Sequence, residues 1–190
     1  VNLGGFSNIS IKNNGVITAF DVCPANIVLN EVCQQLGIEY DNNGDVAKRG
    51  KLIPILLEQL NSLDFYKQKA PKSLSREWVE KNISPLLKNN KTEDILNTFC
   101  EHIAKQIGIF LKNESALFTG GGVFNTYLIE RIKYHSYSKI IIPDNTLINF
   151  KESLIFAFLG VLRIENQVNC LQSVTGAKRD NCGGVIHHPY

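Results

Sequence analysis

The sequence of 190 residues contains no methionine and a single tryptophan. Since a natural translation product begins with Met, we expect the chain to be a fragment or to have had its N-terminal part removed. No apolar run approaches the roughly 20 residues of a membrane helix. There is also no basic segment followed by an apolar one at the start, as in a signal peptide. The sequence therefore predicts no association with a membrane.

Charge and cysteine usage exclude further classes of protein. A net charge of +2 is too small to indicate nucleic acid as the main partner. The five cysteines are scattered and form no C-x-x-C pair, which disfavours a zinc site. Scattered cysteines in apolar patterns are typical of reduced core residues, so we expect a cytoplasmic protein.

The N-terminal residues read as strands. Residues 6–11 alternate apolar and polar side chains, as a half-buried strand does. Asn14-Gly15 then supplies a strong hairpin signal, and residues 15–20 return as the partner strand. With residues 1–3 in front, the pattern predicts a three-stranded antiparallel meander.

A largely helical region follows. We expect Asn26 to cap a helix that stops at Gly37. Residues from about 51 to 112 read as a helical insertion, in which Pro54 is tolerable only in a first turn.

The last third alternates between strands and helices. The expected segments are a strand at 116–119, a glycine turn at 120–122, a helix at 125–134, a buried strand at 139–143 and a helix at 151–162. Such a β-α-β-α run implies parallel pairing with right-handed crossovers. A meander that feeds parallel strands is the ribonuclease H-like layout of an α/β domain. We expect one domain over residues 1–190.

Gly4-Gly5 and Asp21 are the first candidates for chemistry. A glycine pair lets backbone N–H groups approach a ligand where a Cβ would intervene. Asp21 ends a β-like run at the mouth of the helix that opens near Asn26. Phosphate-binding backbone beside a general base suggests phosphoryl transfer. The plain alternatives, a hairpin turn and a helix-capping carboxylate, remain open at this point.

Gly120-Gly121-Gly122 lies between a strand and a helix, where open α/β sheets bind ligands. It is neither a Walker A loop nor a dinucleotide fingerprint, because no Gly-Lys-Ser/Thr follows and position 125 is Asn. A tight turn is an equal alternative. Glu152 lies in the first turn of its helix, where it favours the helix dipole or points into a cleft.

Six blocks in order give the chain a resemblance to the C-terminal half of the anhydro-N-acetylmuramic acid kinase family, which belongs to the sugar-kinase/Hsp70/actin superfamily. The blocks are residues 2–8, Phe20-Asp21-x-x-Pro24-x-Asn26, Pro71-Lys72-Ser73-x-x-Arg76-Glu77, Gly120-Gly121-Gly122-x-x-Asn125, Glu152-x-x-x-Phe156-Ala157 and 174–177. The resemblance covers essentially the whole chain. It implies a ribonuclease H-like, actin-like ATPase domain with a helical insertion.

The resemblance also implies a reaction. The family uses ATP, with Mg²⁺, and water to open the 1,6-anhydro ring of anhydro-N-acetylmuramic acid and phosphorylate oxygen 6 during cell-wall recycling. It implies Asp21 as the base that activates water, and Glu152 and Asn26 as sugar ligands. The implied nucleotide ligands are Gly4, Gly5, Gly120, Gly121, Gly122 and Asn125.

Two departures from the family pattern leave alternatives open. Cys23 and Ala25 replace the family's common glycines, which adds Cβ atoms near the base and leaves room for another sugar or small acid as the substrate. The family's N-terminal half, with its first phosphate loop, is absent, so we expect little or no kinase activity from this chain alone. The expected partners are that missing lobe and, for the assembled protein, a second copy in a homodimer. A non-catalytic binding module is the third interpretation.

Overall fold

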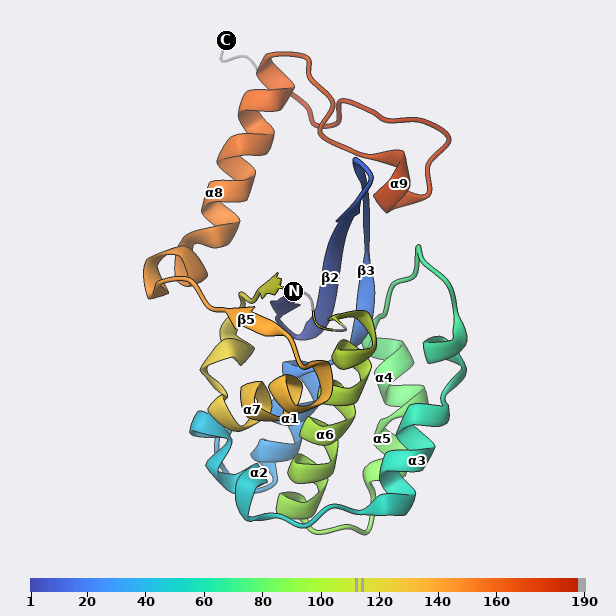
Figure 1. Ribbon diagram of the computed structural model, residues 1–190, viewed down its shortest axis with the longest axis vertical. Coiled ribbons are helices and arrows are strands. Elements are labelled where there is room, and N and C mark those ends of the chain that lie inside the picture. The colour runs from blue at the N-terminus through green and yellow to red at the C-terminus, as the bar shows by residue number, and fades with distance from the viewer. Residues whose placement is uncertain (112, 114, 188–190) are drawn as a thin grey trace.

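The computed structural model describes residues 1–111, 113 and 115–187 (Figure 1). Residues 112, 114 and 188–190, which belong to the domain expected from the sequence, lie outside the described residues. The elements follow in this order: β1 (Asn2–Leu3), β2 (Phe6–Asn13), β3 (Val16–Pro24), α1 (Asn26–Gln34), η1 (Asn42–Gly44), α2 (Asp45–Arg49), α3 (Pro54–Ser62), η2 (Asp64–Lys67), α4 (Arg76–Asn82), α5 (Ser84–Leu87), α6 (Thr92–Leu111), β4 (Ser115–Leu117), η3 (Gly121–Phe124), α7 (Thr126–Ser136), β5 (Lys139–Ile141), α8 (Asn145–Ile164) and α9 (Gln172–Thr175).

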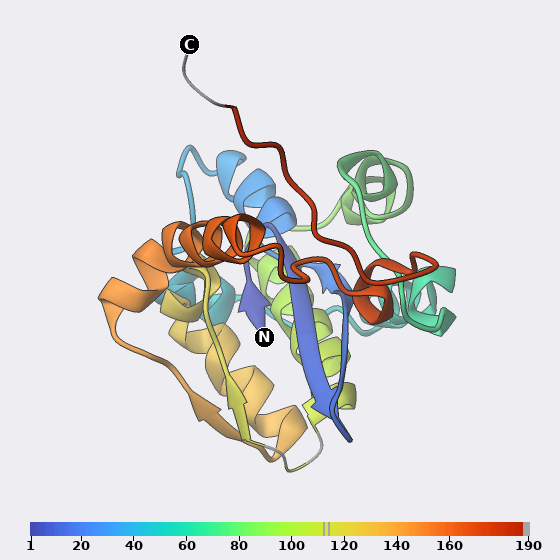
Figure 2. The same cartoon turned by 90° about the horizontal axis from the view of Figure 1, so that it is seen from above.

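The predicted meander is confirmed. β1 pairs antiparallel with β2, and β2 pairs antiparallel with β3 in a long hairpin that is prominent in Figure 2. Asn14 and Gly15 at the tip both have positive φ values, 48° and 81°. Two consecutive residues of positive φ suit the right-handed twist of a two-residue hairpin turn, and Asn-Gly adopts them readily.

The parallel part is confirmed as well. β4 pairs parallel with β5. The backbone of Thr119 continues β4 and bridges to β1, since Leu3 N donates to Thr119 O at 2.7 Å and Thr119 N donates to Val1 O at 3.0 Å. The five strands therefore follow one another in space as β3-β2-β1-β4-β5, and the domain is mixed α/β.

The expectation that residues 139–143 form a buried strand is wrong. Ile140 packs against the core, but Ile141 and Ile142 are 43% and 42% exposed. β5 is the last strand in the order, and successive side chains of a strand point to opposite faces. Only one face of β5 is covered by the rest of the described chain, so Ile140 is partly buried and its neighbours are exposed.

Helix α6 is the centre of the core. Its apolar residues at helical spacing, among them Phe99, Ile103 and Ile107, are fully buried. They pack with Leu3 of β1 and Phe118 in one continuous cluster. Burial of each large apolar side chain contributes about 1.5–3 kcal/mol. This helix therefore fixes the back of the sheet, and α1 and α7 pack beside it.

A buried polar network ties α3 and η2 to α6. His102 Nδ1 lies 2.8 Å from Asn61 Oδ1, which also accepts a hydrogen bond from Gln106 Nε2. Since that oxygen only accepts, His102 carries its proton on Nδ1 and its Nε2 accepts from the Tyr66 hydroxyl at 2.8 Å. The network holds α3 and η2 against α6.

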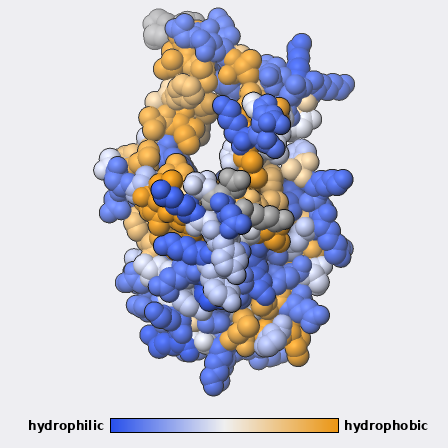
Figure 3. All heavy atoms as spheres, in the orientation of Figure 1, coloured by the Kyte–Doolittle hydropathy of each residue, from blue (hydrophilic) through white to orange (hydrophobic). Residues whose placement is uncertain are grey.

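Helix α8 extends away from the rest of the domain (Figure 1). It begins six residues before its predicted start, because Asp144 caps it by accepting from Leu147 N at 2.9 Å. Apolar side chains gather along it in the space-filling view (Figure 3). The large exposed ones are Phe150, Leu154, Ile155, Phe156, Phe158, Val161 and Ile164. No helix in the described part of the chain combines the length and apolar character needed to cross a membrane.

Candidate functional site

The two predicted glycine turns converge on Asn2. A Cβ placed on Gly120 would lie 2.7 Å from Asn2 Oδ1 and equally close to Leu3 O, and one on Gly4 would lie 3.2 Å from Asn2 Nδ2. Gly120 also has a positive φ of 86°. Only glycine allows this conformation and this approach without strain. The Asn2 amide therefore lies between the two turns, a position that the sequence pattern does not indicate.

The Gly4-Gly5 turn uses its carbonyl groups to hold the start of α1. Ala25 N and Ile27 N donate to Gly5 O at 2.8 and 3.1 Å, and Asn26 N donates to Gly4 O at 3.2 Å. These bonds satisfy N–H groups that a helix N-terminus leaves without intrahelical partners. The carbonyl groups of this turn therefore fix where α1 begins.

Asn26 does not cap α1 as predicted. The residue at the cap position is Ala25, without a side-chain hydrogen bond, whereas Asn26 Nδ2 donates to Leu3 O at 3.2 Å. A Cβ on Gly122 would lie 2.8 Å from Leu3 Cβ and 3.2 Å from Asn26 Oδ1. Asn26 thus packs β1 against the second glycine turn instead of serving its own helix.

Four predicted ligand residues line one cavity of about 650 Å³: Asn26, Gly121, Gly122 and Asn125. A Cβ added to Gly121 would meet nothing within 4 Å, so its backbone borders open space. Asn125 accepts from Leu128 N at 2.9 Å and so caps α7. The cavity therefore lies at the N-terminal end of α7, with tyrosine and polar side chains of residues 40–43 on its other side.

Asp21 is held by a segment 50 residues away. Its Oδ2 accepts from Leu74 N at 2.8 Å, and its backbone N donates to Lys72 O at 3.0 Å. Lys72 in turn donates to Phe65 O at 3.1 Å, and its ammonium lies 4.4 Å from the centre of the Phe65 ring. Burial lowers the pKa of Lys72. The segment that carries Lys72 and Leu74 thus orients the Asp21 carboxylate.

Asp21, Asn8 and Asn2 form a row across the sheet. Asn2 pairs with Asn8 and Asn8 pairs with Asp21, so the three residues share one face, opposite the face that Leu3 and Ile9 bury. Adjacent strands lie about 4.8 Å apart, which places Asn2 and Asp21 about 10 Å apart. The predicted base and the glycine turns are therefore brought to one face.

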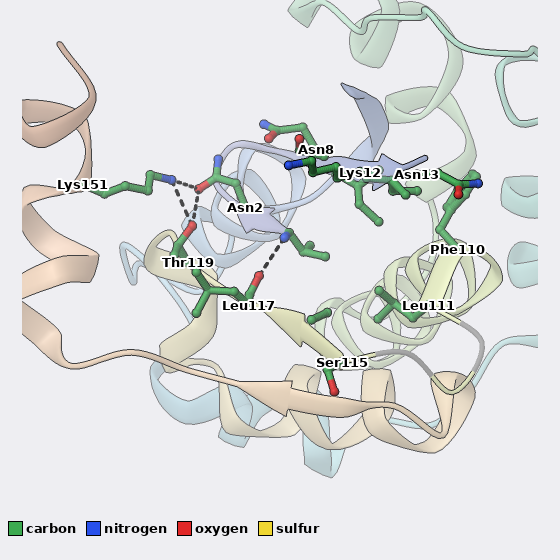
Figure 4. A pocket seen from close by; sticks show the side chains of 15 residues that line it. Asn2, Asn8, Lys12, Asn13, Phe110, Leu111, Ser115, Leu117, Thr119 and Lys151 are labelled. Atoms are coloured by element: carbon green, nitrogen blue, oxygen red, sulfur yellow. Dashed lines mark hydrogen bonds between the residues drawn. The ribbon is translucent and has the colours of Figure 1, made fainter. Parts of the chain in front are cut away.

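Glu152 is exposed, and the described residues give it no hydrogen-bond or ion-pair partner. Its neighbour Lys151 reaches the site instead: Nζ donates to Asn2 Oδ1 and, at 3.1 Å, to Thr119 Oγ1 (Figure 4). Lys151 lines a second cavity, of about 810 Å³, which runs along β2 from Asn8 to Asn13 and is bordered on its other side by β4. Two features of the sequence could have indicated Asn2 and Lys151. Asn2 is a polar residue beside a glycine turn, and Lys151 is a cation beside Glu152.

The two residues that replace family glycines point away from this face. Cys23 and Ala25 are fully buried, and Cys23 pairs with the buried Ser7 on the core side of the sheet. Burial raises the pKa of the Cys23 thiol. Their side chains therefore do not line either cavity, and they give no direct reason to expect a different substrate.

Comparison with known proteins identifies the family of the chain. The model of the anhydro-N-acetylmuramic acid kinase family matches residues 1–189. The chain belongs to this family. Curated members named anhydro-N-acetylmuramic acid kinase include one from Gamma-proteobacterium EBAC31A08, 34% identical over 91% of this chain and 50% of the relative. One from Saccharophagus degradans is 32% identical, and the match covers 99% of this chain and 54% of the relative. One from Francisella tularensis subsp. novicida is 34% identical, and the match covers 93% of this chain and 51% of the relative. The chain spans about half the length of these relatives.

Among solved structures, the chain is similar to the activator of the 2-hydroxyisocaproyl-CoA dehydratase from Clostridium difficile with bound ADPNP. The sequence identity is 18%, the TM-score is 0.46, and the match covers 75% of this chain and 52% of the activator. A likeness of this size carries no argument about function.

Proposed function

We propose that the chain is the nucleotide-side lobe of a cytoplasmic, ATP-dependent kinase that opens the 1,6-anhydro ring of anhydro-N-acetylmuramic acid and phosphorylates oxygen 6. The observation that carries the proposal is the convergence of both glycine turns on Asn2, in a cross-strand row with Asp21. Such a row offers phosphate-binding backbone and a carboxylate to a single substrate.

We assign the domain to the ribonuclease H-like, actin-like ATPase fold. The strand order β3-β2-β1-β4-β5 supports this assignment, with an antiparallel meander followed by parallel strands that α7 connects. The helical elements between α1 and β4, over roughly residues 51–112, are then the insertion.

The residues present suit ATP. The cavity of about 650 Å³ is large enough for a nucleoside, and the exposed backbone at Gly121 gives a planar group close access. Gly4 and Gly5 would hold phosphate oxygens through their N–H groups. The described residues contain no cluster of three His, Cys, Asp or Glu side chains. Mg²⁺ usually binds through phosphates, waters and one or two carboxylates, which this site can offer. When bound, ATP with Mg²⁺ supplies the phosphoryl group and neutralises its charge.

Asp21 is the general base in this proposal. Leu74 N occupies one carboxylate oxygen and fixes the orientation of the group, so the other oxygen is available to a water molecule. Asp21 removes a proton from that water molecule while the water oxygen bonds to the anomeric carbon of the sugar. The bond from that carbon to oxygen 6 breaks, and oxygen 6 would then take the γ-phosphoryl group as its bond to the bridging oxygen breaks and ADP leaves. Glu152 and Asn26 are the proposed sugar ligands.

The proposal includes a partner for this lobe. The chain spans about half of its curated relatives, and α8 exposes a row of large apolar side chains. Exposed apolar surface of this kind marks an interaction site. We assign its occupant as the other half of the kinase, which would close the cleft over ATP, and expect little or no activity from the 190-residue chain alone.

The test uses a protein of the relatives' full length that carries this chain. We expect ATP-dependent formation of N-acetylmuramic acid 6-phosphate from anhydro-N-acetylmuramic acid, followed by ³¹P NMR. Phosphorylation of a different sugar or acid in a panel would replace the substrate assignment. Absence of nucleotide hydrolysis with every sugar tested would favour a binding module. Turnover by the 190-residue chain by itself would contradict the need for a second lobe.

A further inference from the structure

Lys151 is a cation held by neutral groups. Its two hydrogen-bond acceptors in the described structure are the Asn2 amide and the Thr119 hydroxyl, and no carboxylate lies within ion-pair distance among the described residues. Burial lowers the pKa of Lys151, and the neighbouring Glu152 carboxylate offsets part of that shift. A partly buried ammonium with no carboxylate in direct contact favours a ligand that brings negative charge.

The position of Lys151 indicates that a ligand bound at the glycine turns would supply the negative charge. Asn2 Oδ1, which accepts from Lys151, is also among the atoms that a Cβ on Gly120 would approach most closely, and Asn2 Nδ2 is next to Gly4. Lys151 is therefore linked through one amide to both glycine turns. It lies at the Asn2 end of the row whose other end is Asp21, about 10 Å away.

The surrounding cavity is free of acidic side chains. The residues that line the cavity of about 810 Å³ include Lys151, Lys12 and the ammonium of Val1, with both polar and apolar side chains and no Asp or Glu. A lysine ammonium has three N–H donors, and Asn2 and Thr119 take two of them. The third is available to a ligand in the cavity (Figure 4).

We propose that Lys151 contacts the phosphoryl group that the kinase transfers, through a hydrogen bond from Nζ to a non-bridging oxygen. This inference rests on the proposed function and adds a residue to it. The ammonium neutralises phosphoryl charge and moves no proton, so it binds as a point charge beside the N–H groups of the glycine turns. The spacing between Asp21 and Lys151 then accommodates one sugar ring, with the attacking water at one end and the phosphoryl group at the other.

Binding of inorganic phosphate to the 190-residue chain tests the assignment without any need for catalysis. Titrations followed by ³¹P NMR compare wild type, Lys151→Met and Lys12→Met. Loss of one charged hydrogen bond predicts an affinity about tenfold weaker or more for Lys151→Met. Lys12→Met is the matched control, because it removes a cation from the same cavity, and we expect its affinity to change less than about twofold. Equal affinity of wild type and Lys151→Met, or no phosphate binding by wild type, would overturn the assignment.

Kinetics of the full-length protein separate this role from a structural one. We expect Lys151→Met to lower kcat about a hundredfold with KM for the sugar nearly unchanged, and Lys151→Arg to recover part of the loss. A rise in KM for the sugar alone, with kcat retained, would contradict contact with the transferred group. If wild type phosphorylates no sugar, the proposed function fails, whereas the phosphate titration still decides the role of Lys151.

Discussion

Gly120 and Gly121 are neighbours with different roles. Gly120 has a positive φ, and a Cβ there would lie 2.7 Å from Leu3 O, which is backbone and cannot move aside cheaply. Gly121 has neither restriction and borders the cavity of about 650 Å³. One glycine therefore serves the packing of β1 against the turn, and the other leaves the cavity open at its backbone.

The pair gives a first prediction. Gly120→Ala destabilises the protein by about 2 kcal/mol or more, since it combines an unfavourable φ with overpacking. Gly121→Ala changes stability by less than about 0.5 kcal/mol but weakens ATP binding, because its methyl group enters the cavity. Urea unfolding and nucleotide titration measure the two effects. Equal destabilisation by both substitutions would show that the turn is not packed as described.

The residue scale also shows what the sequence could and could not predict. The Asn14-Gly15 turn and the first-turn position of Pro54 depend on neighbours within a few residues, so local patterns suffice for them. The cap at Asp144 is equally local, but the sequence pattern predicts the start of that helix at residue 151. The local pattern assigns Asn26 to its own helix, whereas its actual acceptor, Leu3 O, is 23 residues away. No local pattern carries that information.

At the scale of elements, the segment between η2 and α4 is the clearest case of a distant part that positions a functional residue. Lys72 anchors this segment on Phe65, and Leu74 two residues later donates to Asp21. The Phe65 ring packs in turn against Trp78, at 5.4 Å between ring centres. The loop and the aromatic cluster therefore form one support for the carboxylate.

The second prediction concerns this support. Lys72→Met lowers stability by about 1–2 kcal/mol through loss of the cation–π contact. It also shifts the emission of Trp78, the single tryptophan, and lowers kcat of the full-length kinase with little change in KM for ATP. Lys67→Met is the control, because Lys67 forms an exposed ion pair with Asp64. Identical emission and kcat in wild type and Lys72→Met would show that the loop does not position Asp21.

Order and type of the elements follow from the sequence more reliably than their surroundings. The meander and the β-α-β-α run can be predicted because periodicity and turn residues specify them locally. The exposed face of β5 and the docking of residues 72–74 on Asp21 cannot, since each depends on what lies across from it in space. The contact of Lys151 with Asn2, 149 residues away, belongs to the same class.

At the scale of the whole molecule, the buried His102 couples stability to pH. Burial lowers its pKa from the ordinary 6.5 to about 3. Between these values the unfolded chain binds a proton that the folded protein does not, so stability falls as the pH falls below 6.5. The limiting slope is about 1.4 kcal/mol per pH unit. Urea unfolding from pH 7 to pH 5 measures this slope. In His102→Gln the slope should be smaller by up to about 1.4 kcal/mol per pH unit, which is the contribution of one proton. An unchanged slope in His102→Gln would contradict a neutral buried ring.

Glu101 adds a separate effect at lower pH. Burial alone would raise its pKa, but hydrogen bonds from Arg131 at 2.7 Å and His135 at 2.6 Å outweigh burial, and the pKa is lowered from 4.5. The carboxylate thus stabilises the packing of α6 against α7 above pH 4.5, and this contribution is lost as the pH falls through the folded pKa. Arg131→Met should lower the free energy of unfolding at pH 7. It should also make that free energy depend less on pH below pH 4.5.

The exposed face of α8 predicts association of the isolated chain. We expect sedimentation velocity to show concentration-dependent self-association of the 190 residues, because large apolar side chains lack cover. Phe156→Gln with Ile164→Gln should reduce association without loss of thermal stability, since both side chains are mostly exposed. A monomer at all concentrations, with no effect of these substitutions, would argue against α8 as a contact surface.

The most direct test of the account is the dependence of sugar phosphorylation on Asp21 in a full-length protein that carries this chain. Asp21→Asn keeps an oxygen for Leu74 N but cannot accept a proton, and Asp64→Asn is a control at an exposed carboxylate. We predict that Asp21→Asn lowers the rate of N-acetylmuramic acid 6-phosphate formation by about 10²–10⁴-fold, with unfolding midpoint and ATP affinity retained, and that Asp64→Asn matches wild type. Wild-type rates in Asp21→Asn would contradict the account.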